Sequence, residues 1–358
     1  MRIGPINLRL KPSAASFYVP VMPHKRTSFG LTLSNRALVT RGTPPQELID
    51  MAVEAEKTGA IDAIWVGDSI LSKPRLECIP LLGAIAAQTS RVKLGVACMA
   101  SIAQRNPVLL ALQWASLDVL SGGRTWLAAC MGYPASQHPM AAKELEVMGI
   151  QSKERPRRLE EMIQALRVLW SDEQASFHGK YYSFDDVNLL PKPAQQPCPI
   201  YIAGTPRPTQ IGERGVERSL RRMARYADGW MSNQIELAMF QEYSGRLREM
   251  LVEEGRDPNA FKTVLYYGVA VNRDRDQAFR EAKAFLDAYY QKDFTRPGVE
   301  IWTACGPVEH CVDCVRGFID AGVDHVTIRP VGADLTDQFR IFLNDVLPGL
   351  NLAAARAA

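Results

Sequence analysis

The stretch RVKLGVACMASIAQRNPVLLALQWASLDVLSGGRTWLAACM, residues 91–131, has two short apolar runs on either side of a longer apolar segment. Short runs that are almost wholly apolar are typical of parallel strands covered on both faces. The segment between them, residues 107–123, is long enough for a helix and closes at two glycines, which favour a helix C-terminus. The stretch therefore predicts a strand, a helix and a second, parallel strand.

The same alternation continues along the chain. Eight apolar runs predict strands, within residues 28–34, 60–67, 91–99, 124–131, 199–204, 227–232, 261–272 and 324–330. Eight parallel strands, each followed by a helix, fit a (β/α)8 TIM barrel with insertions, in the α/β class. An open doubly wound sheet is the alternative, but the turn after the first strand, NRALVTRG, lacks the G-x-G-x-x-G fingerprint of that fold.

The domain organisation follows from composition. No linker or compositional break divides the chain, so a single domain is expected over residues 28–350. Residues 1–27, rich in proline and serine, are expected to form an N-terminal arm, and residues 351–358 a tail. The segment 171–198 is expected to be an insertion between the fourth and fifth units, with a small hairpin in it.

Charge and cysteine content narrow the function. The 358 residues carry a formal net charge of +3, with no block of like charges typical of a nucleic-acid or membrane surface. We therefore expect a small-molecule substrate. Seven cysteines, an odd number in mostly apolar surroundings, indicate reduced thiols, and we therefore expect a cytoplasmic protein. The C-x-x-C of Cys311 and Cys314 lies in a helical pattern without a second ligand pair, so no metal site is expected.

The functional residues of a TIM barrel lie at the C-terminal ends of its strands. The predicted strand ends offer one carboxylate and many small or sulfur-bearing residues. They lack a carboxylate cluster for a divalent metal, a G-x-S-x-G or H-E-x-x-H motif, and a lysine for a Schiff base. Polar groups this sparse indicate that a cofactor carries the chemistry. Arg124 begins the fourth strand, so we expect it at the opposite end, in a salt bridge with Asp118 or another acid.

Six segments follow one another in an order that resembles the bacterial luciferase-like superfamily of flavin-dependent oxidoreductases, the luciferase-like monooxygenases. They are AIDAIWVGDS, SRVKLGVA, RNPVLLALQWASLDVLSGGR, YYSFDDVNLLPKPAQQPCPIYIAG, RMARYADGW and DAGVDHVTIRP. The resemblance covers about residues 28–348 and implies a (β/α)8 barrel, a cofactor that is reduced FMN or coenzyme F420, and often a homodimer. It also implies a non-prolyl cis peptide at the end of the third strand, at about Cys98–Met99.

The resemblance also implies roles for strand-end residues. Cofactor contacts are expected from Cys98, Met99, Ala100, Cys130, Met131, Gly132, Tyr133, Gly204, Thr205, Arg207 and Trp230. Many relatives have a histidine at the end of the second strand, where this chain has Asp68 and Ser69. The acid–base role is therefore open, with Asp68, Ser69 and His138 as candidates. Met131 stands where luciferases carry an arginine that helps to hold phosphate, which argues against aldehyde chemistry of the luciferase type.

Three functions are compatible with this pattern. The leading hypothesis is a two-component monooxygenase that takes reduced FMN from a separate flavin reductase and oxygenates a small organic substrate with O2. Hydride transfer with coenzyme F420 is one alternative, and a non-catalytic flavin-binding protein is the other. The substrate is expected to meet the loops 34–43, 133–155 and 290–305. Asn35, Arg36 and Arg329 are expected to contact a polar or anionic group on it.

Overall fold

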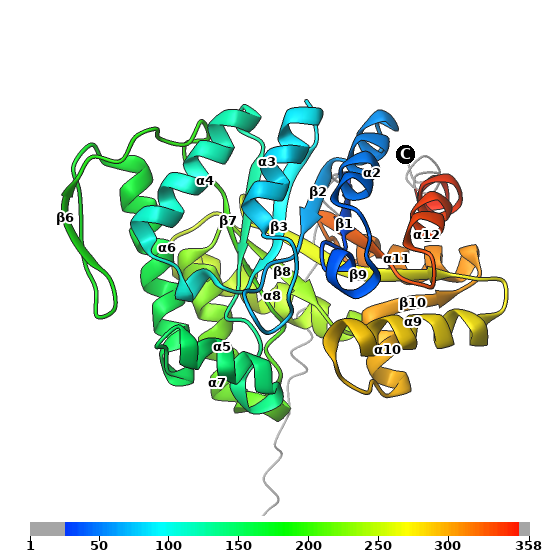
Figure 1. The fold of residues 1–358 in the computed structure, drawn as a ribbon. Coiled ribbons are helices and arrows are strands. Elements are labelled where there is room, and N and C mark those ends of the chain that lie inside the picture. The colour runs from blue at the N-terminus through cyan, green and yellow to red at the C-terminus, as the bar shows by residue number, and fades with distance from the viewer. Residues whose placement is uncertain (1–25, 351–358) are drawn as a thin grey trace, which may run out of the picture.

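A computed structural model describes residues 26–350 and shows a closed barrel of eight parallel strands surrounded by helices (Figure 1). Strand β9 pairs with both β8 and β11, and β11 pairs with β1, so the sheet closes on itself. This confirms the TIM-barrel fold expected from the sequence. The barrel strands are β1 (Ser28–Leu33), β2 (Ala63–Val66), β3 (Lys93–Met99), β4 (Thr125–Ala129), β7 (Ile200–Ala203), β8 (Gly229–Asn233), β9 (Lys262–Val271) and β11 (His325–Pro330).

Helices follow each barrel strand and cover the outside of the barrel (Figure 1). The longer ones are α2 (Pro45–Lys57), α3 (Cys78–Gln88), α4 (Pro107–Ser121), α5 (Pro139–Val147), α6 (Arg155–Ser171), α7 (Pro208–Tyr226), α8 (Leu237–Glu253), α9 (Arg275–Tyr290) and α11 (Val308–Asp320). The shorter ones are α1 (Ala37–Arg41), α10 (Arg296–Trp302) and α12 (Leu335–Ile341). Within residues 26–350, no helix combines the length and the apolar composition that crossing a bilayer would require. The predicted tail lies outside the described residues, as does nearly all of the predicted arm.

Helix α4 shows why the decisive stretch folds as the sequence predicts. Asn106 caps its start, because the side-chain oxygen accepts hydrogen bonds from the backbone N–H of Val108 (3.0 Å) and Leu109 (3.1 Å). Gly122 ends the helix with φ at +69°, a conformation that glycine adopts without steric cost. The chain then turns directly into β4.

Arg124 lies at the N-terminal end of the barrel, as expected, but it forms no salt bridge with Asp118. Its guanidinium donates to backbone carbonyl oxygens near the end of α3, including those of Ala86 (3.0 Å) and Thr89 (2.9 Å). Asp118 instead accepts hydrogen bonds from Thr125 and Gln195. The expected ion pair is therefore wrong, because both charged groups already have neutral partners.

Two additions extend the barrel. Strands β5 (Ala175–His178) and β6 (Ser183–Val187) form an antiparallel hairpin within residues 171–198, which projects on the left of Figure 1. Strand β10 (Thr303–Gly306) pairs with the last four residues of β9, outside the closed ring. The loop expected over residues 290–305 is therefore mostly structured, as helix α10 and strand β10.

The barrel interior differs between its two ends. Near the N-terminal end it is filled by Trp65, Trp126, Tyr201 and His325, whose rings contact one another. Trp65 also explains Gly95, since a Cβ atom there would lie only 2.1 Å from the indole. Toward the C-terminal ends of β3, β4 and β7 the side chains that face inward are small. The smallest side chains of the interior therefore lie at the predicted site.

Candidate active site

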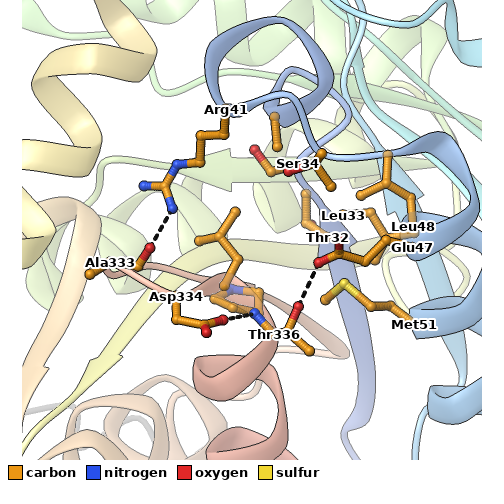
Figure 2. A pocket seen from close by; sticks show the side chains of 14 residues that line it. Thr32, Leu33, Ser34, Arg41, Glu47, Leu48, Met51, Ala333, Asp334 and Thr336 are labelled. Atoms are coloured by element: carbon orange, nitrogen blue, oxygen red, sulfur yellow. Dashed lines mark hydrogen bonds between the residues drawn. The ribbon is translucent and has the colours of Figure 1, made fainter.

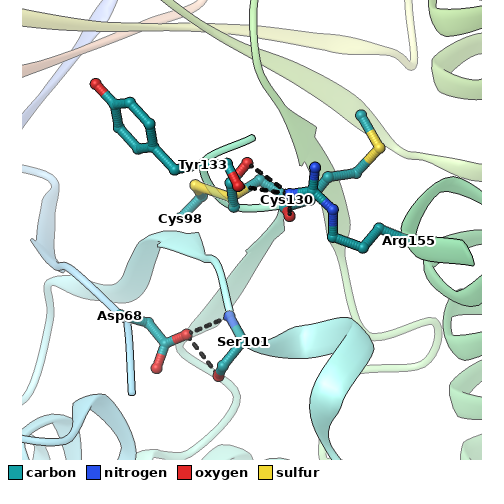
Figure 3. Close-up of a disulfide and its surroundings, with 8 residues drawn as sticks. Asp68, Cys98, Ser101, Cys130, Tyr133 and Arg155 are labelled. Atoms are coloured by element: carbon teal, nitrogen blue, oxygen red, sulfur yellow. Dashed lines mark hydrogen bonds between the residues drawn. A yellow bond between two sulfur atoms is a disulfide. The ribbon is translucent and has the colours of Figure 1, made fainter. Parts of the chain in front are cut away.

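The ends of β3 and β4 meet, as the sequence predicts, and a disulfide joins them (Figure 3). The bond links Cys98 to Cys130, so the expectation that all cysteines are reduced is wrong for this pair. The other five cysteines are free. A non-prolyl cis peptide is present, but it joins Ala97 to Cys98, one bond earlier than the predicted Cys98–Met99.

Arg155, at the start of α6, holds the loop that leaves β4. Its guanidinium donates to the carbonyl oxygens of Met131 (2.8 Å) and Tyr133 (2.7 Å). Gly132 lies between them with φ at +70°, and a Cβ atom there would be 3.1 Å from the carbonyl oxygen of Ala100. The backbone of this loop is thus fixed close to the end of β3.

Two predicted cofactor contacts face away from the barrel interior. Met99 is fully buried in the core between the strands and the outer helices. Trp230 lies in the same outer core, donates to the carbonyl oxygen of Gly204 (2.7 Å) and stacks on Phe240. The physical reason is strand alternation, because Met231, next to Trp230, occupies the inward position. We therefore withdraw Met99 and Trp230 as cofactor contacts.

Asp68 is buried in a network that fixes the loop after β3 (Figure 3). One carboxylate oxygen accepts from the backbone N–H (2.8 Å) and the hydroxyl (2.7 Å) of Ser101. The other accepts from Arg105 (3.0 Å), which also binds Glu77 (2.7 Å). Asp68, Glu77 and Cys78 could together suit a metal ion, but the guanidinium already balances the two carboxylates. This arrangement argues against Asp68 as a mobile acid or base.

Ser69 and Asn35 are also committed to the protein. Ser69 exchanges a hydrogen bond with Ser72 (2.7 Å) in a loop whose backbone N–H groups bind Glu144. Asn35 donates to the carbonyl oxygens of Gly67 (2.8 Å) and Leu76 (2.7 Å) and accepts from the N–H of Gly67. Neither side chain has the free groups that a catalytic or substrate-binding role would need, so both predictions lose their support.

The other half of the barrel mouth is cationic. Arg36 follows β1, Arg329 lies near the end of β11, and Lys73 and Arg75 come from the loop after β2. None of the four forms an ion pair with a carboxylate within residues 26–350. Burial lowers the pKa of Lys73 well below its usual value, and the neighbouring guanidinium charges lower it further. The positive potential of this cluster is therefore poorly balanced by the protein.

Aromatic rings from outside the barrel strands surround these cations. The Cζ atoms of Arg36, Arg75 and Arg329 lie 5.7, 5.6 and 4.8 Å from the centre of the Tyr289 ring. Lys73 Nζ lies 5.0 Å from the ring of Tyr290, the next residue of α9. These distances place the cations in the range of cation–π attraction, which holds them without neutralising them.

His138, which precedes α5, lies in the same region. Its side chain is buried, and neither ring nitrogen has a hydrogen-bond partner among the described residues. Burial lowers the pKa of His138, and the charges of Lys73 and Arg36 lower it further. The ring centre is 5.8 Å from that of Tyr133. The structure thus brings His138 together with Arg36 and with the loop after β4.

The predicted phosphate turn after β7 has a different character. Thr205 donates to the carbonyl oxygen of Asn233 (2.5 Å), and Arg207 donates to that of Gln234 and lies 3.4 Å from Glu236. Gly204 has φ at +138° with open space where a Cβ atom would be. Of the three, Gly204 alone leaves its surroundings free for a ligand.

Open space near these residues is limited. A cavity of about 10 Å³ lies between the ends of β3 and β4, lined in part by Ala100, Met131 and Gly132. A larger cavity, of about 210 Å³, lies elsewhere on the barrel, between α1, α2 and the start of α12 (Figure 2). Figure 2 shows that its polar side chains already have partners, since Thr336 donates to Glu47 and Arg41 donates to the carbonyl oxygen of Ala333. The larger cavity does not contain the cationic cluster.

A sequence profile of the luciferase-like monooxygenases matches residues 27–325. The chain belongs to this family. A luciferase-like relative from Kineococcus radiotolerans, an F420-dependent glucose-6-phosphate dehydrogenase, is 25% identical over 328 residues, which are 85% of this chain and 93% of the relative. The protein is accordingly an oxidoreductase, as the sequence predicts.

Solved luciferase-like structures share the fold at lower identity. An F420-dependent secondary alcohol dehydrogenase, in complex with an F420–acetone adduct, superposes with a TM-score of 0.74 at 19% identity, covering 91% of this chain and 99% of that one. The long-chain alkane monooxygenase LadA superposes with a TM-score of 0.70 at 17% identity, covering 92% of each. Likeness at this identity shows the fold alone.

Several residues of the site escaped the sequence analysis. Lys73 and Arg75 lie in SKPRLE, shortly after β2, where two cations beyond a strand end were the available signal. Arg155 had no such signal, since it begins a helix and acts on a loop 22 to 24 residues earlier. Tyr289 and Tyr290 end helix α9, far in sequence from any strand end.

Proposed function

We propose that this protein is a coenzyme F420-dependent oxidoreductase, which transfers a hydride between the deazaflavin and a small organic substrate. One observation carries the proposal: the similarity over 85% of the chain to a relative named for this cofactor. The secondary alcohol dehydrogenase with the bound F420–acetone adduct shares the fold and is consistent with it. Hydride transfer with F420 was the first alternative in the sequence analysis, where the FMN-dependent monooxygenase was the leading hypothesis.

The small residues at the ends of β3, β4 and β7 suit a flat cofactor. Ala97, Ala128 and Ala203 belong to the cluster inside the barrel, where their small side chains would let a flat ring lie against the strand ends. Gly132 keeps the next turn of backbone close without a side chain. Because Lys73 lies 4.6 Å from the Tyr133 ring across this region, we expect both side chains to move when the cofactor binds. The cofactor would supply or accept the hydride.

Proton transfer at the substrate is assigned to His138. A buried imidazole whose pKa is lowered is neutral near pH 7, so one ring nitrogen can accept a proton. Both nitrogens are free of partners among the described residues, in contrast to the carboxylate of Asp68. Asp68 and Arg105 act instead as positioning residues for the loop after β3.

Anaerobic titration tests the cofactor. Purified protein is titrated with reduced F420 and, separately, with reduced FMN, and binding is read by cofactor fluorescence. We expect saturable binding of F420, at least about tenfold tighter than that of FMN, which corresponds to about 1.4 kcal/mol. The Gly204→Val variant is expected to weaken F420 binding, because the new side chain enters the open space at the β7 turn. Tighter binding of FMN would overturn the proposal.

The second candidate is the FMN-dependent monooxygenase with a separate flavin reductase. It is favoured by the structural likeness to LadA, a long-chain alkane monooxygenase. Both candidates would bind their cofactor at the same strand ends, and they differ in whether O2 takes part in the reaction. Oxygen consumption that depends on a substrate, with reduced FMN present, would identify the monooxygenase.

A further inference from the structure

The donors of Arg36 and Arg329 are buried but incompletely used. Arg36 is 3% exposed and Arg329 is 1% exposed. Nε and Nη1 of Arg36, and Nε and Nη2 of Arg329, have no hydrogen-bond acceptor within residues 26–350. Burying a charged donor without an acceptor is costly, and such groups are rare in folded proteins. Two neighbouring arginines with this property indicate a ligand that accepts hydrogen bonds.

The charge around them has one sign. Arg75 adds to the positive potential, and Nζ of Lys73 is a further donor that binds no described residue. Glu144 is the nearby carboxylate, but its oxygens already accept hydrogen bonds from the N–H groups of Leu71 and Ser72 and from Gln104. An acceptor that carries negative charge therefore fits these donors better than a neutral one.

The donors are also held in place. Arg329 donates to the hydroxyl of Tyr290 (3.2 Å), and its guanidinium lies within 5.5 Å of the centres of five rings. Its position on β11 puts it on the inward face, since its neighbour Ile328 belongs to the outer core. A guanidinium fixed in this way loses little freedom when it binds a planar or tetrahedral anion.

We propose that Arg36 and Arg329 bind an oxyanion group, a carboxylate or a phosphate, carried by the substrate. Arg75 supplies further positive potential, and His138 lies beside the bound group. The assignment rests on the proposed function for the reaction, and it adds the chemical class of the substrate. The site lies on the β1 and β11 side, opposite β7 in the barrel order, where the cofactor phosphate is expected. Neutral alcohols are therefore poor substrates.

The test uses the full chain and simple anions as probes. Thermal unfolding and calorimetric titration are measured with sodium phosphate and with sodium acetate, against sodium chloride at equal ionic strength. We expect saturable stabilisation by phosphate or acetate beyond that by chloride. The anion that binds more tightly identifies the source as a phosphate or a carboxylate group. Equal effects of all three salts would overturn the proposal.

Arg36→Met separates binding from structure. The variant is expected to weaken the oxyanion at least about tenfold, the loss expected for charge-assisted hydrogen bonds. Without any oxyanion it is expected to melt at a higher temperature than the parent, because buried donors without acceptors and like-charge repulsion are removed. If Arg36 had only a structural role, its replacement would lower the melting temperature. A lower melting temperature together with unchanged anion binding would overturn the proposal.

Arg41→Met is the matched control. Arg41 is the last residue of α1, the short helix that Arg36 precedes. It is exposed and donates to the carbonyl oxygen of Ala333 (2.7 Å), outside the cationic cluster. It should retain the oxyanion effect in full. Arg329→Met provides a second measurement of binding, should Arg36→Met fold poorly.

The cofactor titration keeps the two proposals distinguishable. Arg36→Met should bind reduced F420 within about twofold of the parent. If F420 affinity falls together with phosphate affinity, the arginines hold an anionic part of the cofactor, and the assignment to substrate is overturned. If the parent binds phosphate as expected but not F420, the function proposed above fails and the oxyanion site stands.

Discussion

Two sides of the barrel mouth treat buried charge in opposite ways. On the β2–β3 side, Asp68 accepts hydrogen bonds from Ser101 and Arg105, so its charge is satisfied by the chain itself. On the β1–β11 side, Arg36 and Arg329 keep nitrogen atoms without acceptors among the described residues. Since Asp68, Arg36 and Arg329 are all buried, burial alone does not explain the difference. The first side fixes the backbone, and the second leaves donors unpaired, as the proposed oxyanion site requires.

The largest expected effect comes from removing the buried charge of Asp68 on the β2–β3 side. Asp68→Asn should lower the free energy of unfolding by about 3 kcal/mol, because it leaves Arg105 and the N–H of Ser101 poorly paired in a buried position. Urea unfolding measures the change. Glu77→Gln is the control, since Glu77 is an exposed partner of the same arginine, and its loss should cost less than about 1 kcal/mol. Equal losses in the two variants would contradict the comparison.

Gly132→Ala tests how rigid the β4 turn is. Its φ of +70° disfavours any side chain, and the new Cβ would press on the carbonyl oxygen of Ala100. We expect a loss of about 2 kcal/mol, measured by urea unfolding. Gly42→Ala has the same φ but no atom within 4 Å, so its loss should be only about 1 kcal/mol. If the two losses are alike, the contact with Ala100 has no energetic weight.

The buried histidine at the other end of the barrel predicts a pH effect on stability. Burial lowers the pKa of His325 to about 3, while Ser28 and Trp65 hold its two ring nitrogens. The unfolded chain takes up a proton below about pH 6.5 and the folded chain does not, so stability is lost as pH falls from there toward 3. Between about pH 7.5 and 5.5 this histidine should account for about 1.4 kcal/mol. Urea unfolding at both values, in the parent and in His325→Gln, should show a shallower pH dependence in the variant.

The smallest effect concerns the second buried histidine. His138 lies beside the cationic cluster, so phosphate bound there should raise the pKa of His138 by offsetting the charges of Lys73 and Arg36. Titration of the histidine ring signals by NMR, with and without phosphate, measures this shift. His325 serves as the internal control, because it lies at the far end of the barrel. A His138 signal that phosphate does not move would argue against an anion in this cluster.

The barrel could be predicted from the sequence because each strand and helix is encoded by a pattern of neighbouring residues. Each strand is a short apolar run that ends in a turn, as in residues 91–131, and eight such runs leave few other folds. Strand ends also pointed to Cys98, Cys130, Arg36 and Arg329, which do lie at the mouth. Whether a strand-end side chain faces inward was harder to predict, as Met99 shows, because the β-bulge near Cys98 shifts the alternation.

The hydrogen-bond partners of the polar side chains could not be predicted from the sequence. Asn35 looked available for a substrate, yet it bonds to Gly67 and Leu76 across a loop. Tyr289 and Tyr290 gave no signal, because they reach the mouth from the end of a helix inserted after β9. Such contacts join segments far apart along the chain, so only the folded arrangement reveals them.

Strand β10 makes the segment from α9 to β10 a separable addition to the barrel. The segment from α9 to β10 leaves the barrel after β9 and returns to pair with that same strand, so its two ends lie close together. It carries Tyr289, Tyr290 and Trp302, three of the five rings around Arg329, while β10 pairs with β9 alone and is not one of the eight strands that close the barrel. Exchange of the α9–β10 segment between related barrels would therefore change the surroundings of Arg329, and with them the proposed substrate preference. The ends of β3, β4 and β7, where the cofactor is proposed to bind, would stay unchanged.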